Sequence, residues 1–148
     1  MGSTQSNDGD VSGYINHPYD PAKTDMWLLK IDGNGNKVWQ KTLGGSERDY
    51  AESIVKEGNN FIIGGATSSS DGDISLAKGG YDIWILKINE TGGLVWEKAI
   101  GGSQSEYFTE LKVLLNGSFA DLGSTNSNDG DVNSYYDPHS HFLNDEAV

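Results

Sequence analysis

Residues 82–102 read Asp-Ile-Trp-Ile-Leu-Lys-Ile-Asn-Glu-Thr-Gly-Gly-Leu-Val-Trp-Glu-Lys-Ala-Ile-Gly-Gly, and this stretch decides the fold because it occurs twice. The earlier copy, residues 25–45, reads Asp-Met-Trp-Leu-Leu-Lys-Ile-Asp-Gly-Asn-Gly-Asn-Lys-Val-Trp-Gln-Lys-Thr-Leu-Gly-Gly. Trp27 and Trp84 stand at equivalent places, 57 positions apart. Self-similarity at a fixed period of this size is the signature of a repeat architecture. The sequence therefore predicts a repeat protein.

Each copy predicts short strands joined by turns. Within residues 25–43 the apolar side chains alternate with the period of two that is typical of a strand. The Asp, Gly and Asn residues at 32–36 allow the chain to reverse, which predicts a hairpin. Two further strands are expected at 51–56 and 61–66, with a turn at 57–60. Helical apolar periodicity is absent, so the predicted fold class is all-β.

The repeat makes residues 1–148 a single array. We expect four-stranded antiparallel units, two of them full and two partial, because four short strands fit into each period. The parts are the end of a preceding unit with a loop (1–24), repeat 1 (25–81), repeat 2 (82–139) and the start of a degenerate third unit (140–148).

Both ends of the chain carry traces of the repeat. Residues 2–11 nearly match residues 123–132, so the chain is expected to begin inside a repeat and to be a piece of a longer array. Phe142 stands where Trp27 and Trp84 stood, and polar residues follow it. Such a polar end suits the terminus of an array, since a terminal repeat needs a polar outer face.

Four motifs together resemble the repeats of secreted bacterial β-propeller proteins (SBBP-type repeats). They are Trp-x-Leu-Lys-Ile, Val-Trp-x-Lys, Gly-Gly-Ser followed by (Asp/Glu)-Tyr, and Ser-x-Asp-Gly-Asp. The resemblance implies propeller blades and an extracellular or cell-surface location. Propellers usually close with about 4–8 blades. The remaining blades are therefore expected to come from further parts of the same protein or from further copies of the chain. The third alternative is that the blades stack in an open form and no ring closes.

Composition excludes several classes of partner. The net charge of −12 opposes binding to a phosphate backbone, so no nucleic acid partner is expected. The chain has no cysteine, which excludes disulfides and thiolate metal sites. No apolar run approaches the length of about 18 residues that a membrane helix needs, and no signal peptide is visible.

A loop of the form Asp-Gly-Asp occurs three times and is the candidate metal site. Two carboxylates that flank a glycine can converge on Ca²⁺, with backbone carbonyls and water completing the 6–8 oxygen ligands. The alternative is a set of Asx turns in solvated loops. Equivalent loops are expected on one side of the array, where an acidic rim would bind calcium weakly. The candidate ligands are Asp8, Asp10, Asp71, Asp73, Asp129 and Asp131.

The aromatic residues divide into core and surface candidates. Trp27, Trp39, Trp84 and Trp96 recur at fixed strand positions, so all four are predicted to be buried in the core. The loop residues Tyr19, Tyr135 and Tyr136 are the candidates for a surface that binds a protein or carbohydrate ligand. A metal pair at His139 and His141 is a weaker alternative to two solvated side chains.

Nothing in the sequence predicts an enzyme. The acidic residues mostly recur in matched positions, whereas a catalytic site needs one poised acid or base. Asp121 is the exception because it replaces Ile63, and it is either a buried carboxylate with a raised pKa or a solvent-facing residue of an edge strand. We therefore expect a non-enzymatic interaction or scaffold module. The alternative is a fragment of a carbohydrate-active or carbohydrate-binding propeller.

Overall fold

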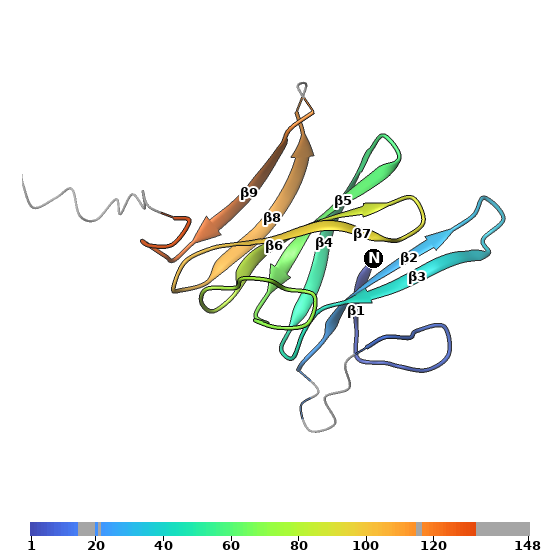
Figure 1. The fold of residues 1–148 in the computed structure, drawn as a ribbon, viewed down its shortest axis with the longest axis horizontal. Helices are drawn as coiled ribbons and strands as arrows, with labels where there is room; N and C mark the ends of the chain where they lie inside the picture. The colour runs from blue at the N-terminus through green and yellow to red at the C-terminus, as the bar shows by residue number, and fades with distance from the viewer. Residues whose placement is uncertain (15–19, 21, 115–116, 133–148) are drawn as a thin grey trace, which may run out of the picture.

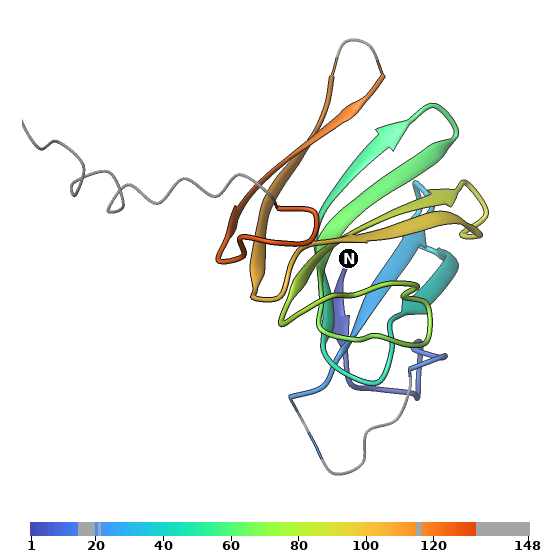
Figure 2. The same cartoon turned by 60° about the vertical axis from the view of Figure 1, so that its left-hand side comes forward.

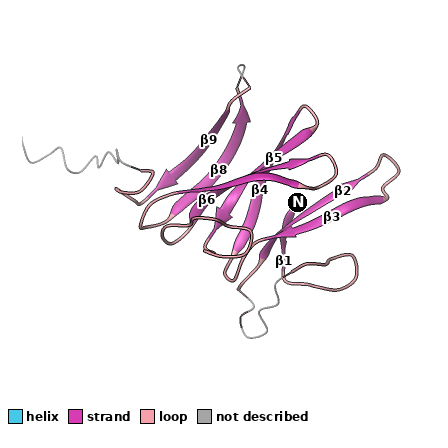
Figure 3. Ribbon diagram, in the orientation of Figure 1, coloured by secondary structure: helices cyan, strands magenta, loops and turns pink. Residues whose placement is uncertain are grey.

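The computed structural model describes residues 1–14, 20, 22–114 and 117–132. These residues form nine β-strands in three antiparallel sheets and contain no helix (Figure 3). The predicted all-β class is confirmed. The strands are β1 (Gly2–Thr4), β2 (Asp25–Ile31), β3 (Lys37–Leu43), β4 (Asp49–Glu57), β5 (Asn60–Thr67), β6 (Asp82–Asn89), β7 (Leu94–Ile100), β8 (Glu106–Val113) and β9 (Phe119–Thr125).

The sheets are offset from the sequence repeat by half a unit. Strand order is β1-β2-β3 in the first sheet, β4-β5-β6-β7 in the second and β8-β9 in the third. The described part of the chain thus holds one four-stranded sheet, not the two expected from 25–81 and 82–139. The reason is that β5 pairs with β6 across the repeat boundary along its whole length, from Asn60 with Asn89 to Thr67 with Asp82.

The three sheets follow one another in chain order, with the four-stranded sheet in the middle (Figures 1 and 2). The hairpin turns of β2-β3, β4-β5, β6-β7 and β8-β9 lie at one end of the sheets. The longer connections, which contain the Asp-Gly-Asp loops, lie at the other end. All three Asp-Gly-Asp loops therefore follow equivalent strand ends.

The two repeats share irregularities as well as strands. A bulge shifts the β4-β5 register between Ala51 and Ser53, and the equivalent bulge lies between Phe108 and Glu110. Beside the bulge, a Cβ atom on Gly65 would lie 2.0 Å from the carbonyl oxygen of Tyr50. A side chain at this position is excluded because the neighbouring backbone approaches too closely.

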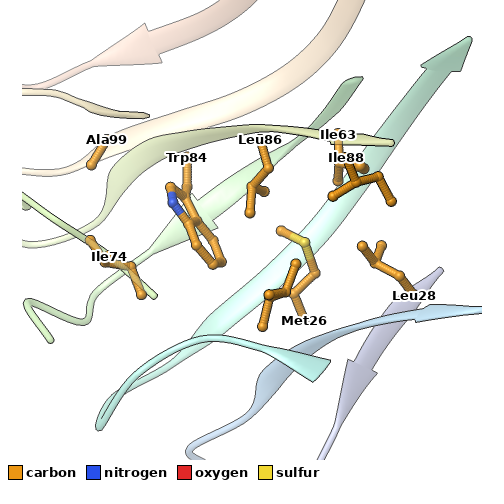
Figure 4. Packing of buried hydrophobic residues seen from close by; sticks show 9 residues of the cluster. Met26, Leu28, Ile63, Ile74, Trp84, Leu86, Ile88 and Ala99 are labelled. Carbon is orange, nitrogen blue, oxygen red and sulfur yellow. The ribbon is translucent and has the colours of Figure 1, made fainter. Parts of the chain in front are cut away.

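The main core lies between the first and second sheets (Figure 4). Trp84 and Leu86 of β6 and Met26 of β2 have no exposed surface or almost none, and Ile74 covers them from the loop after β5. A second cluster of Ile62, Phe108 and Leu111 joins the second sheet to the third. Each sheet thus buries one face against the next, as expected of a repeat array.

The prediction that all four tryptophans are buried is wrong. Trp84 is fully buried, but Trp27 and Trp39 are half-buried and Trp96 is 39% exposed. The physical reason is position along the array. Trp84 lies between two sheets, whereas Trp27 belongs to the first sheet and Trp96 faces the direction in which a further sheet would follow.

Candidate functional site

The first polar site joins an Asp-Gly-Asp loop to the segment that follows β3. The backbone N–H of Ser46 donates to Asp71 Oδ1 at 2.7 Å. The backbone N–H of Asp73 donates to the Gly44 carbonyl at 2.9 Å. Gly72 has a φ of +66°, and a Cβ atom on it would lie 2.3 Å from the Gly44 carbonyl oxygen. Only glycine fits there, because both the backbone conformation and the available space exclude a side chain.

The second repeat builds the same site with nearly the same distances. The backbone N–H of Ser103 donates to Asp129 Oδ1 at 2.7 Å, and that of Asp131 donates to the Gly101 carbonyl at 2.9 Å. Lys78 adds an ion pair with Asp131, with Nζ and Oδ2 2.5 Å apart. We call these two sites the loop clamps, defined by Gly44–Ser46 with Asp71–Asp73 and by Gly101–Ser103 with Asp129–Asp131.

The first Asp-Gly-Asp loop has different partners. Asp8 accepts a short hydrogen bond from the hydroxyl of Ser6. Asp10 Oδ1 lies 2.5 Å from Lys37 Nζ on β3. This loop has no Gly-Gly-Ser segment beside it in the described residues, so its carboxylates contact side chains.

Hydrogen bonds hold several of these loop carboxylates in their charged form. The side-chain hydrogen bond from Lys37 lowers the pKa of Asp10, and that from Lys78 lowers the pKa of Asp131. The backbone N–H of Ser103 lowers the pKa of Asp129. The loops therefore stay negatively charged at neutral pH.

All six predicted calcium ligands already accept hydrogen bonds from backbone or side-chain donors. Among the described residues, no three Asp, Glu or His side chains come together as a metal-binding group. The geometry of the loop clamps matches the alternative interpretation, in which the carboxylates order a turn. Calcium binding at the loops stays a prediction.

Two pairs of buried acids lie directly beneath the loop clamps. A Cβ atom on Gly101 would lie 2.1 Å from Asp82 Oδ1 and 2.3 Å from Glu106 Oε2, so these oxygens converge on one point. In the first repeat a Cβ atom on Gly44 would lie 2.6 Å from Asp25 Oδ1 and 2.8 Å from Asp49 Oδ2. All four acids are buried.

The members of the second pair have opposite pKa shifts. Burial raises the pKa of Asp82, and the charge of Glu106 raises it further. Burial also opposes ionisation of Glu106, but hydrogen bonds from Ser127, Thr125 and the Gly102 N–H outweigh it and lower the pKa of Glu106. Asp82 therefore keeps its proton to higher pH than an exposed Asp, and a hydrogen bond from Asp82 helps to lower the pKa of Glu106. In the first repeat, burial likewise raises the pKa of Asp49.

The sequence shows that the acidic residues recur in matched positions, but it did not reveal that Asp49 pairs with Asp25 and Glu106 with Asp82. The available signal was the period, because both acids and the glycine above them recur 57 positions apart. The convergence itself depends on how the segment after β3 or β7 folds back over the sheet. That tertiary arrangement has no local sequence signal.

Asp121 lines a pocket of about 220 Å³ between the second and third sheets, with Ile83, Ile100, Gly123 and Val132 among its other walls. Its Oδ1 atom is buried and has no hydrogen-bond donor among the described residues. Burial raises the pKa of this carboxyl. Asp121 thus combines features of the two alternatives: it is half-buried, with a raised pKa, on the strand β9, which within the described residues pairs with β8 alone.

The predicted ligand-surface residues Tyr19, Tyr135 and Tyr136 lie outside the described residues, and so do His139, His141 and Phe142. The tyrosine surface and the histidine pair therefore stay predictions. The large aromatic side chains that it does show at the surface are Trp96 and Tyr107.

Comparison with protein-family models gives no match to this chain, and comparison with curated protein sequences gives none either. What the fold defines is an all-β repeat array with a polar site at each repeat. The part of the chain that the structure describes has no helix with the length and apolar character needed to cross a bilayer.

Proposed function

We propose that the chain is a non-enzymatic interaction or scaffold module of an extracellular or surface-exposed bacterial protein, built from β-propeller-like blades. The blade is the four-stranded sheet β4-β5-β6-β7, flanked by a partial blade on each side. The resemblance of the repeat motifs to secreted β-propeller proteins supports both the blade and the location.

The observation that carries the proposal is the repetition of the loop clamp. The hydrogen bond from Ser46 to Asp71 and the hydrogen bond from Ser103 to Asp129 have the same atoms and the same length, 2.7 Å. These acidic residues act on the chain's own backbone, and each clamp joins the end of one sheet to a loop of the next. A polar site that recurs in each repeat in this way stabilises an array and has no need of a substrate.

Weak calcium binding is part of this proposal. The Asp-Gly-Asp loops lie at one end of the sheets, and hydrogen bonds keep Asp10, Asp129 and Asp131 ionised. A cation held near such a rim relieves the repulsion between the carboxylates. Extracellular calcium modules of this kind bind with Kd values of about 10⁻⁴–10⁻³ M.

A carbohydrate-active or carbohydrate-binding propeller fragment is the second candidate. One observation favours it: Asp121 is an unrepeated carboxyl with a raised pKa at the wall of a pocket. Perturbed carboxyls in concave sites are candidates for acid–base chemistry. Trp96, with 39% of its surface exposed, offers a ring on which a sugar could stack.

The experiment that separates the two candidates is a turnover screen. The purified chain is incubated with a panel of polysaccharides and aryl glycosides, alongside Asp121→Asn. The scaffold proposal expects no release of reducing sugar or aryl alcohol above the level of the variant. Turnover that Asp121→Asn abolishes, while circular dichroism shows an unchanged fold, would overturn the scaffold proposal in favour of the enzyme.

A further inference from the structure

The first sheet exposes an apolar row whose equivalent inside the array is buried. Leu29 and Ile31 of β2 are 38% and 58% exposed. Their equivalents on β6, Leu86 and Ile88, have no exposed surface because they pack in the core between the first two sheets. The outer face of β2 therefore carries the same apolar positions as the buried face of β6. Within the described residues, no sheet packs on this face of β2.

The opposite end of the array exposes a complementary surface, which contains Trp96. The indole N–H of Trp39 donates to the Glu90 carbonyl at 3.0 Å, and its ring lies 3.1 Å from the position that a Cβ atom on Gly92 would take. The equivalent ring, Trp96, is 39% exposed. The turn residue equivalent to Gly92 is Gly35, and a Cβ atom there would have nothing within 4 Å. The Trp96 ring at one end thus has no turn packed on it, and the turn at Gly35 at the other end has no tryptophan ring packed on it, within the described residues.

The pocket beside Asp121 repeats this complementarity. Its walls Ile83 and Ile100 are the equivalents of Met26 and Leu43. In the main core, Met26 and Leu43 belong to the same buried cluster as the indole of Trp84. The pocket is therefore the position that a tryptophan of a following β6-like strand would fill, and Trp27 on β2 is such a tryptophan.

The strand edges match in register as well. β1 pairs with β2 through Gly2 with Trp27, Ser3 with Met26 and Thr4 with Asp25. The tripeptide of β1 is repeated at the end of β9 as residues 123–125. In the four-stranded sheet β5 pairs with both β4 and β6, whereas within the described residues β9 pairs with β8 alone. The β9 edge can therefore take the place of β1 on β2 with unchanged pairing.

We propose that the chain assembles head-to-tail with further copies of itself. The β8-β9 hairpin of one copy replaces β1 on the next copy, giving a four-stranded sheet of the order β8-β9-β2-β3, and Trp27 of the next copy enters the pocket between Ile83 and Ile100. The inference rests on the blade repeat of the proposed scaffold. It does not depend on the ligand or on the location of that scaffold.

The contact uses two different surfaces, so it is heterologous and generates either a closed ring or an open filament. Each copy contributes one complete sheet and two half sheets, which makes two blades for each copy. Since propellers close with about 4–8 blades, a closed ring of this chain contains about two to four copies.

The test uses one charge on each surface and a control. Ile31→Glu alters the exposed face of β2, and Trp96→Glu alters the opposite face. Val38→Glu is the matched control, because the equivalent residue Val95 keeps 52% of its surface exposed inside the array, and Val38, at 54%, is expected to stay exposed in the assembly as well. All three variants of the full chain are checked by circular dichroism and studied by sedimentation equilibrium over a wide range of concentration.

We expect the wild type and Val38→Glu to assemble beyond the mass of one chain as concentration rises. Ile31→Glu and Trp96→Glu should each weaken association by at least about 30-fold, the equivalent of about 2 kcal/mol for an interface hot spot. An equimolar mixture of these two variants keeps one intact surface of each kind. It should form a heterodimer and nothing larger.

Two outcomes overturn the proposal. A wild type that stays monomeric at all concentrations shows that these surfaces do not meet between copies, as when another segment of the same chain covers them. Assembly that Ile31→Glu and Trp96→Glu leave unchanged shows that another surface is used. Neither outcome bears on the scaffold function, which depends on the turnover screen.

Discussion

Replacing Trp84 by Ala tests where the core of the array lies. Trp84 is fully buried between the first two sheets, and its indole N–H donates to Glu97 Oε2 at 2.9 Å. Trp96 offers a matched comparison, because it is the same residue type on the neighbouring strand with 39% of its surface exposed.

The magnitude follows from buried area. Large aromatic side chains bury about 150–250 Å², and at about 25 cal/mol per Å² the upper part of that range corresponds to about 5–6 kcal/mol. Measured losses for buried aromatic residues changed to Ala are about 3–5 kcal/mol, and we expect Trp84→Ala to fall in this range. Trp96 buries about three-fifths of its surface, so Trp96→Ala should cost about 2 kcal/mol less than Trp84→Ala.

The assay is urea unfolding followed by far-ultraviolet circular dichroism, at a concentration where the chain is monomeric. A difference of about 2 kcal/mol corresponds to about 4–8 °C in Tm for a chain of this size, so thermal unfolding is an independent check. Equal losses of unfolding free energy for Trp84→Ala and Trp96→Ala would refute the reasoning. The difference in burial between Trp84 and Trp96 would then have no effect on the free energy of unfolding.

The polar sites give three further predictions. Because burial raises the pKa of Asp82, its contribution to stability is present at low pH and is lost as pH rises through the raised value. Asp82→Asn should therefore flatten the fall in unfolding free energy that urea titrations show as pH rises above about 4, the ordinary pKa of an Asp. Gly101→Ala should lower Tm by several degrees, since its Cβ atom would lie 2.1 Å from a buried carboxyl oxygen, whereas Gly33→Ala, with nothing within 4 Å, should leave Tm nearly unchanged. Calcium at 10⁻⁴–10⁻³ M should raise Tm in the wild type and not in the double variant Asp71→Asn with Asp73→Asn; an equal midpoint with calcium and with chelator would leave the loops as structural turns only.

The strands were predictable because their signals are local. The alternation within 25–31 and the Asp, Gly and Asn residues of 32–36 define a hairpin without any tertiary information, and the structure places β2 and β3 on either side of that turn. Because the sequence repeats, the same strands are predicted in the second copy. The strand β8 follows in this way from its counterpart β4, which the sequence predicts at 51–56.

Sheet membership was less predictable, since it depends on contacts across the repeat boundary. The sequence shows that a unit holds four strands. A periodic sequence does not show, however, which of these strands is the first strand of a sheet. The pairing of Gly65 with Trp84 decides that the sheet runs from β4 to β7. The exposure of Trp96 has the same origin, because a periodic pattern cannot distinguish an inner sheet from an outer one.

The offset between the sheet and the sequence repeat has a consequence for how such a chain can change length. A duplicated segment of 57 residues that is inserted in register contains four strands wherever it begins. If it begins at β2 it supplies two strands to each of two sheets, and if it begins at β4 it supplies one complete sheet. Recombination between repeats therefore adds or removes whole sheets without leaving an unpaired strand inside the array. The site of the crossover does not matter, so an array of this kind can vary in length by genetic exchange while every interior hydrogen-bond ladder stays complete.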